Sequence, residues 1–318
     1  MERPSLSWTY MSEIVRRVAE RIRNLEIQGA RNIAMAAISV LAEAAESSKA
    51  RNREGFLREL LEAKEILFNT RETEPLMRNA LRKILFEVKE SRLTDPRELA
   101  GLVSSLSREF IKGLEASNRR IAEYGSKRIR SGYRVLTHCH SSTVVGILRR
   151  AREEGKDFEV LCTESRPRYQ GRITARELLE EGIRTTMIVD SAVRNFMKTV
   201  DLVLVGADAI TSEGNVVNKI GTSMIALVAY EARIPFYVAS ELLKFSPQTT
   251  YGEYEKIEER SGEEVWKDAP PGLIIRNPAF DVTRRDYIHG IICEEGIISP
   301  HTILEVVRRR YPWVLAVD

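Results

Sequence analysis

The reactive side chains of this sequence lie in short polar segments that follow apolar runs. Cys139 stands between two histidines after the run 134–138, and Asp208 follows the run 201–206. Near the start of a helix, a thiolate is favoured by the helix dipole, so Cys139 could act as a base or nucleophile. A carboxyl group at the mouth of a sheet is partly desolvated, which raises its pKa and lets it deliver a proton. Both residues also have ordinary interpretations, an inert buried cysteine and an aspartate that caps a turn.

Basic residues in the same half of the chain could hold a phosphate. The segment 218–222 (NKIGT) is predicted to open a helix over 219–232, where backbone N–H groups and Lys219 suit an anion. Arg166 and Arg168 fit either a bidentate phosphate clamp or ordinary surface charges. The phosphate-loop pattern G-x-x-x-x-G-K-[ST] and the dinucleotide pattern G-x-G-x-x-G are both absent, which disfavours the enzymes that use them. We expect no metal, because the histidines and cysteines lack the spacing of zinc ligands.

The elements that must position these residues follow from the apolar periodicity. Over residues 9–126, apolar residues recur every three or four positions, which predicts successive helices. Beyond about residue 130, short apolar runs alternate with helical segments, which is typical of βαβ units and a parallel sheet covered on both faces. The expected strands are 134–138, 158–163, 185–190, 201–206, 235–239, 272–275 and 288–293, and the expected helices are 143–153, 175–181, 192–197 and 219–232. We therefore predict an α/β fold, with a helical domain over 1–128 and a Rossmann-like parallel-sheet domain over 129–318.

The predicted sheet brings the polar segments together. In open parallel sheets, ligands bind outside the carboxyl ends of the strands. Cys139, the segment 164–171, Asp190, Asp208 and Lys244 all follow predicted strands. We therefore expect them at one rim, as a site for a phosphorylated small molecule.

Composition excludes several classes of function. The 318 residues include 49 Lys and Arg against 46 Asp and Glu, a balance that does not fit a dedicated nucleic-acid binder. Apolar runs stay short of the ~18 residues of a membrane span, and the first residues lack a signal-peptide pattern. Three widely spaced cysteines are no disulfide framework, so we expect a cytoplasmic protein with free thiols.

Several segments, in order, resemble the isomerase superfamily related to initiation factor two B. They are NLEIQGA (24–30), ILFNTR (66–71), THCHSS (137–142), TESRPRYQG (163–171), VGADAITSEGNVVNKIGT (205–222), ELLKFSP (241–247) and NPAFDVT (277–283). The superfamily includes methylthioribose-1-phosphate isomerases, archaeal ribose-1,5-bisphosphate isomerases and regulatory subunits of the exchange factor for initiation factor two. The isomerases carry a catalytic Cys and Asp, which the regulatory subunits generally lack, and Cys139 and Asp208 match both.

The ribose-1,5-bisphosphate isomerases are the branch that the sequence resembles most. The resemblance implies conversion of ribose 1,5-bisphosphate to ribulose 1,5-bisphosphate in AMP degradation, with no cofactor. It further implies a homo-oligomer, a dimer or hexamer, and AMP as an activator. Two alternatives stay open, a methylthioribose-1-phosphate isomerase and a regulatory subunit that binds initiation factor two.

The resemblance assigns roles residue by residue. Cys139 matches the proton acceptor and Asp208 the proton donor. The residues matching substrate-binding positions are Gly29, Ala30, Arg71, Ser141, Thr143, Asn218, Lys219 and Lys244. Three positions depart from the pattern: Gln28 and Ser142 replace an Arg and a Lys found in relatives, and Glu72 replaces a Pro. Arg31, about one helical turn beyond Gln28, is a candidate to supply the missing cation.

Overall fold

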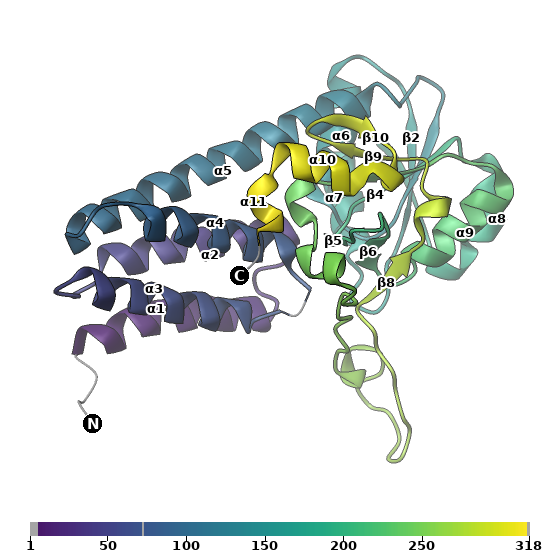
Figure 1. The fold of residues 1–318 in the computed structure, drawn as a ribbon. Helices are drawn as coiled ribbons and strands as arrows, with labels where there is room; N and C mark the ends of the chain where they lie inside the picture. Colours follow the sequence, from purple (N-terminus) through teal and green to yellow (C-terminus); the bar gives the residue numbers. More distant parts are fainter. Residues whose placement is uncertain (1–5, 72, 317–318) are drawn as a thin grey trace. The chain divides into compact units, whose positions relative to one another are not determined.

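The computed structural model describes residues 6–71 and 73–316 (Figure 1). The chain divides into two compact units, the first ending at Glu115 and the second beginning at Ala116. The division falls inside one long helix, α5 (Pro96–Ser126). Each unit has its own architecture.

The first unit is helical, as the apolar periodicity predicts. Besides the start of α5, its helices are α1 (Leu6–Arg23), α2 (Ala30–Glu46), α3 (Arg53–Phe68) and α4 (Pro75–Glu90). Ile22, Leu60 and Leu81, three of the expected apolar positions, have no exposed surface, whereas Leu61, also expected inside, is 50% exposed. Local signals set the helix starts: the Asn52 side chain accepts the N–H of Gly55 at the start of α3, and Pro75 opens α4.

The second unit is built on a seven-stranded sheet with the order β10-β9-β7-β4-β1-β2-β3. The strands are β1 (Arg134–Thr137), β2 (Glu159–Thr163), β3 (Arg184–Ile188), β4 (Leu202–Val205), β7 (Phe236–Ala239), β9 (Gly290–Cys293) and β10 (Gly296–Ile298). Neighbouring strands are parallel except β10, which pairs antiparallel with β9 at the edge. The predicted α/β class is confirmed; the antiparallel edge was not predicted.

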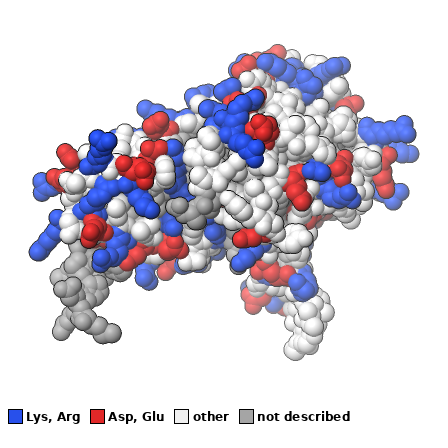
Figure 2. Space-filling view, in the orientation of Figure 1, with Lys and Arg blue, Asp and Glu red and all other residues white. Residues whose placement is uncertain are grey.

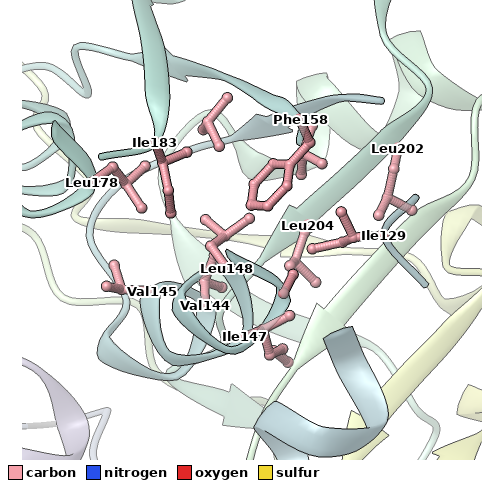
Figure 3. Close-up of a cluster of buried hydrophobic side chains, with 14 of the residues drawn as sticks. Ile129, Val144, Val145, Ile147, Leu148, Phe158, Leu178, Ile183, Leu202 and Leu204 are labelled. Carbon is pink, nitrogen blue, oxygen red and sulfur yellow. The ribbon is translucent and has the colours of Figure 1, made fainter. Parts of the chain in front are cut away.

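Both faces of this sheet are buried at its centre, because every residue of β4 is buried although side chains alternate along a strand. On one face, Leu202 and Leu204 join a cluster that α6 (Ser142–Glu153) fills with Val144, Ile147 and Leu148 (Figure 3). Burying one such side chain stabilises the fold by about 1.5–3 kcal/mol. The other helices are α7 (Gly171–Glu180), α8 (Val193–Phe196), α9 (Thr222–Ala232), α10 (Ile303–Arg310) and α11 (Pro312–Leu315).

The second unit also contains a small antiparallel sheet, which the sequence did not predict and whose strands alternate along the chain with those of the main sheet. Its order is β5 (Ala209–Ile210), β6 (Val216–Lys219) and β8 (Phe280–Thr283). The helix expected over 219–232 therefore begins three residues late, at Thr222. Gly221, with φ +102°, makes the switch from strand to helix in a backbone region that favours glycine.

Two further predictions are corrected. The strand expected at 272–275 is irregular chain within an arm over 252–278 that projects from the second unit (Figure 1). Its apolar residues are exposed, Ile274 by 84%. The helix expected at 192–197 is shortened to α8, with 3₁₀ turns on either side.

The visible surface carries both signs of charge. On the face shown in Figure 2, Lys and Arg are interspersed with Asp and Glu. Within the described residues, we find no helix with the length and apolar character needed to cross a membrane.

Candidate active site

The predicted catalytic residues lie where neighbouring strands of the main sheet end. Cys139 follows β1, and Asp208 follows β4, which pairs directly with β1. The loops after β2 and β3, on the other side of β1, add Ser165 and Asp190. Parallel strands present their carboxyl ends at one edge, so these four residues share one rim, as the sequence predicts.

The backbone of Cys139 is left-handed, with φ +66°. This conformation costs roughly 1–2 kcal/mol for a residue with a Cβ, and such strain is typical of functional sites. Two side chains hold it there: the Cys139 N–H donates to Ser165 Oγ at 2.7 Å, and Thr174 Oγ1 donates to the Cys139 carbonyl at 2.9 Å. The turn that carries the thiol is therefore fixed on both sides of Cys139.

Burial raises the pKa of the half-buried Cys139 thiol to about 11, and the charges of Asp208 and Asp190 act in the same direction. The charge of Lys219 and a hydrogen bond from the His140 backbone N–H act against them. Burial thus outweighs the thiolate-stabilising effect that we expected from the helix start. Near neutral pH the group is a thiol, with Lys219 as the cation that favours its deprotonation.

His138, beside the thiol residue, is buried and neutral. Its Nε2 donates to the Ile220 carbonyl at 2.9 Å, so Nδ1 is the acceptor for the hydroxyl of Thr163 at 2.6 Å. Burial lowers the pKa of His138, consistent with this neutral state. His138 therefore links the end of β2 to the residue that follows Lys219.

Asp208 is half-buried in the turn between β4 and β5. Its N–H donates to the Val217 carbonyl at 2.9 Å, which joins this turn to β6. The charge of Asp208 raises the pKa of the Cys139 thiol. A carboxyl group and a thiol that follow adjacent strands are groups that acid–base chemistry can use.

Asn218 and Lys219 end β6 and are both buried. Asn218 Nδ2 donates to Thr222 Oγ1 at 3.0 Å. The Lys219 ammonium lies 5.2 Å from the centre of the Phe280 ring. A buried cation at the rim is suited to an anionic ligand.

The start of α9 is occupied by the protein's own carboxylate, not open to an anion as the sequence suggested. Asp281, on β8, accepts the N–H groups of Gly221 at 2.8 Å and Ser223 at 3.1 Å. Burial raises its pKa to about 6 despite these two donors. The N–H groups of Gly221 and Ser223 are therefore already bonded, and the buried Lys219 ammonium is the nearby group suited to an external anion.

Lys244 is buried and bound by protein groups. Its ammonium donates to the Ala207 carbonyl at 2.9 Å and lies 3.2 Å from a carboxylate oxygen of Glu241. The pair therefore joins the turn after β7 to the residue before Asp208.

Ser141 and Thr143 lie at the start of α6. The Ser141 side chain accepts the Val144 N–H at 3.3 Å as an N-cap, and Thr143 is buried. A Cβ at Gly206 would lie 2.7 Å from Ser141 Oγ, so only glycine fits there.

The arginines of the loop after β2 do not form a clamp aimed at a ligand. Arg166 donates to the Tyr169 hydroxyl at 2.7 Å and to the Val265 carbonyl at 2.8 Å. Arg168 pairs with Glu264 at 3.1 Å. Both arginines hold this loop to the arm, which favours the structural interpretation.

The remaining predicted residues belong to the first unit. Gly29, with φ +84°, precedes α2, whose first N–H groups have no side-chain cap, and Ala30 is the first helical residue. Arg71 follows α3, and its carbonyl accepts a bond from Arg78 at 3.0 Å. The Nε of Arg31 is buried without a hydrogen-bond partner. Glu72 lies outside the described residues.

Sequence reasoning placed Ser165 and Asp190 at the rim, because both follow predicted strands, but gave them no role. It missed two further residues that shape the rim, Thr174 and Asp281. Asp281 lies in the NPAFDVT segment of the resemblance, whereas no pattern in the sequence pointed to Thr174. Across the described residues, no three His, Cys, Asp or Glu side chains group in a way that would hold a metal ion.

Comparisons with known proteins show which proteins this chain is similar to. The chain is 47% identical to ribose 1,5-bisphosphate isomerase of Archaeoglobus fulgidus over 94% of both chains. It is 36% identical to methylthioribose-1-phosphate isomerase of Acetivibrio thermocellus, over 89% of this chain and 87% of the relative.

Solved structures show the same fold. The translation initiation factor eIF-2B of Pyrococcus horikoshii superposes with a TM-score of 0.78 at 33% identity, covering 90% of this chain and 97% of that one. The 5-methylthioribose 1-phosphate isomerase of P. horikoshii superposes with a TM-score of 0.75 at 33% identity, covering 96% and 88%. The sequence model of the Initiation factor 2 subunit family matches residues 26–300, and the chain belongs to that family.

Proposed function

We propose that this protein is a ribose 1,5-bisphosphate isomerase, which forms ribulose 1,5-bisphosphate in the breakdown of AMP. The observation that carries the proposal is the pairing of Cys139 and Asp208 at one rim, beside Lys219. Six relatives with this name, 38–47% identical over at least 93% of this chain, support the choice of substrate.

The reaction needs one base and one acid. An aldose–ketose interconversion removes a proton at one carbon and delivers a proton nearby, with no net redox change. In our proposal, Cys139 accepts the proton and Asp208 donates one. Because the free thiol has a pKa of about 11, Lys219 is the residue whose charge favours the reactive thiolate. The phosphates anchor the substrate so that the reacting carbons stay in place.

The other predicted residues have proposed roles in substrate binding. Asn218 and Lys219 contact the substrate from β6, and Ser141 and Thr143 from the start of α6. Lys244 is also proposed as a substrate-binding residue, and its bonds to Glu241 and to the Ala207 carbonyl fix its place next to the turn that carries Asp208. From the first unit, we propose Gly29, Ala30 and Arg71 as phosphate-binding residues, on the resemblance described above.

Turnover of ribose 1,5-bisphosphate by the purified protein tests the proposal. Cys139→Ser and Asp208→Asn should abolish turnover, since a serine hydroxyl is a far weaker base and an amide transfers no proton. Cys162→Ala is the matched control, because Cys162 is buried within β2 and should be dispensable. Near-parental turnover in Cys139→Ser would refute its role as the base. A higher KM with unchanged kcat in Asp208→Asn would make Asp208 a binding residue.

Substrate choice tests the alternatives. Methylthioribose 1-phosphate carries one phosphate, so preferential turnover of that sugar would assign the protein to the other isomerase activity. A regulatory role is favoured by the eIF-2B structure to which this chain is similar. Absence of turnover on both sugars, with binding to initiation factor two, would support that role.

We further propose that the protein assembles as a homo-oligomer, a dimer or a hexamer, through its second unit. Met224, Leu227 and Tyr230 are exposed on one side of α9, and the Tyr230 ring lies 5.2 Å from that of Tyr287. An exposed apolar patch of this kind marks an interaction surface. Sedimentation should show an oligomer that Leu227→Glu dissociates; a parental monomer at micromolar concentration would contradict the proposal.

AMP is proposed as an activator, again on the resemblance. Turnover should rise when AMP is added at fixed substrate concentration. An unchanged rate at saturating AMP would remove this part of the proposal.

A further inference from the structure

Two side-chain hydroxyls take up both backbone groups of Cys139. Ser165 Oγ accepts its N–H at 2.7 Å, and Thr174 Oγ1 donates to its carbonyl at 2.9 Å. Ser165 lies in the loop after β2 and Thr174 in α7, so two separate elements hold one residue. Both hydroxyl-bearing residues are buried, with at most 1% of their surface exposed.

The hydrogen bonds of Ser165 have a defined direction. The His138 Nε2 must donate to the Ile220 carbonyl, so Nδ1 accepts the Thr163 hydroxyl proton. Ser165 Oγ lies 3.2 Å from Thr163 Oγ1 and donates to it, which leaves a lone pair for the Cys139 N–H.

The position of Ser165 is itself fixed. Its N–H donates to the Asp190 carboxylate at 2.8 Å, and its own backbone is left-handed, with φ +61°. The hydroxyl that binds Cys139 therefore belongs to a connected, buried network, which is the kind of support that keeps a catalytic group in place.

The Thr174 hydroxyl also has a defined role. Its proton goes to the Cys139 carbonyl, so it accepts from His140 Nδ1 at 3.2 Å. His140 is therefore linked to Cys139 through the Thr174 hydroxyl.

We propose that Ser165 and Thr174 are positioning residues, which hold Cys139 in the left-handed turn that presents its sulfur to the substrate. Without these hydroxyls the strained turn relaxes, because the left-handed region is unfavourable for a residue with a Cβ. Misplacing a reacting group by about 1 Å can cost about a hundredfold in rate. The effect on turnover rests on the proposed isomerase function; the effect on the thiol does not.

Three variants and one control test this proposal. Ser165→Gly removes the hydroxyl yet suits the positive φ of that residue. Thr174→Val is isosteric, and Thr174→Ser restores the hydroxyl. Ser126→Ala is the control, because Ser126 is also fully buried in the second unit and its hydroxyl bonds to the Glu123 carbonyl and the Glu154 carboxylate. The charged neighbours of the thiol stay in all variants.

The first readout is the rate at which iodoacetamide alkylates Cys139 at fixed pH, followed by intact mass. The other two cysteines are fully buried, so the native protein reports on Cys139. We expect Ser165→Gly and Thr174→Val to lower this rate about tenfold, and kcat by about ten- to a hundredfold, with KM within about threefold. Thr174→Ser should recover both rates, and Ser126→Ala should change neither, even if it lowers Tm.

The proposal is overturned if folded Ser165→Gly and Thr174→Val keep both the alkylation rate and kcat within about twofold of the parent. It is also overturned if kcat falls while alkylation stays unchanged, because the hydroxyls would then not act through Cys139. If the parent fails to isomerise ribose 1,5-bisphosphate but the variants still lose alkylation, the positioning role stands and the proposed function fails.

Discussion

Replacing Asp281 by Asn tests the balance of forces at the start of α9. The carboxylate accepts two backbone N–H groups, which favours its charged form, yet burial raises its pKa to about 6 from the ordinary 3.8. Desolvation therefore exceeds the stabilisation by the two donors. The shift of about two pKa units corresponds to at most about 3 kcal/mol, at 1.36 kcal/mol per unit.

The sign of this effect follows from the protons bound. Between about pH 4 and about pH 6, the folded protein holds a proton on Asp281 that the unfolded chain has lost. The contribution to the free energy of unfolding is therefore fully present below about pH 4 and is lost as the pH rises through about 6. Asp281→Asn abolishes this titration but keeps one oxygen to accept an N–H.

Urea denaturation at constant ionic strength, from about pH 4 to about pH 7, measures the difference in unfolding free energy between parent and Asp281→Asn. As the pH rises, the parent should lose up to about 3 kcal/mol of unfolding free energy relative to Asp281→Asn. A flat difference would show that the donors at the start of α9 balance burial, and a shift in favour of the parent would show that they outweigh it; either result would refute the reasoning.

Three more changes have defined outcomes. With a pKa of about 11, Cys139 should be alkylated roughly tenfold more slowly than free cysteine at neutral pH. Its thiolate fraction is about a hundredfold smaller, and the higher nucleophilicity of that thiolate offsets part of this loss. An alkylation rate that reaches a plateau near pH 7 would contradict this prediction. Gly171→Ala should lower the unfolding free energy by about 1–3 kcal/mol or more, because its Cβ would lie 1.7 Å from the Thr163 carbonyl oxygen; an unchanged Tm would disprove the clash. Tyr311→Phe removes the hydroxyl that donates to buried Glu294 at 2.9 Å, and should lower the free energy of unfolding by about 1–3 kcal/mol at neutral pH. Burial raises the pKa of Glu294 to about 6, so this carboxyl group is protonated in acid. Chemical denaturation on either side of pH 6 should therefore show a smaller loss of unfolding free energy at the lower pH.

The main sheet was predictable because its strands are short apolar runs between helical segments. The small sheet was not, since β5 has two residues and β6 owes its pairing to β8, whose Asp281 stands opposite Asn218. Such pairing depends on distant sequence rather than on local pattern. The strand predicted at 272–275 was wrong, because it relied on apolar character alone and Ile274 faces solvent.

The location of the site residues was predictable from their positions in the fold, whereas their hydrogen-bond and ion-pair partners were not. Strand ends placed Cys139 and Asp208 at one rim. No pattern showed that Glu241 would pair with Lys244, or that hydroxyl groups would bind the backbone of Cys139. The raised pKa of Cys139 arises from burial by the assembled unit, which the start of a helix does not reveal.

The long reach of the contacts at the rim also determines when the site forms during folding. The bond between His138 and Ile220 spans 82 residues, and that between Arg166 and Val265 spans 99. Closing such loops costs entropy before any contact repays it, whereas the helices of the first unit close through local bonds. Catalytic competence should therefore be among the last properties to appear on refolding, after most helical signal has returned, and a ribosome must release the chain well past Asp281 before the site can close.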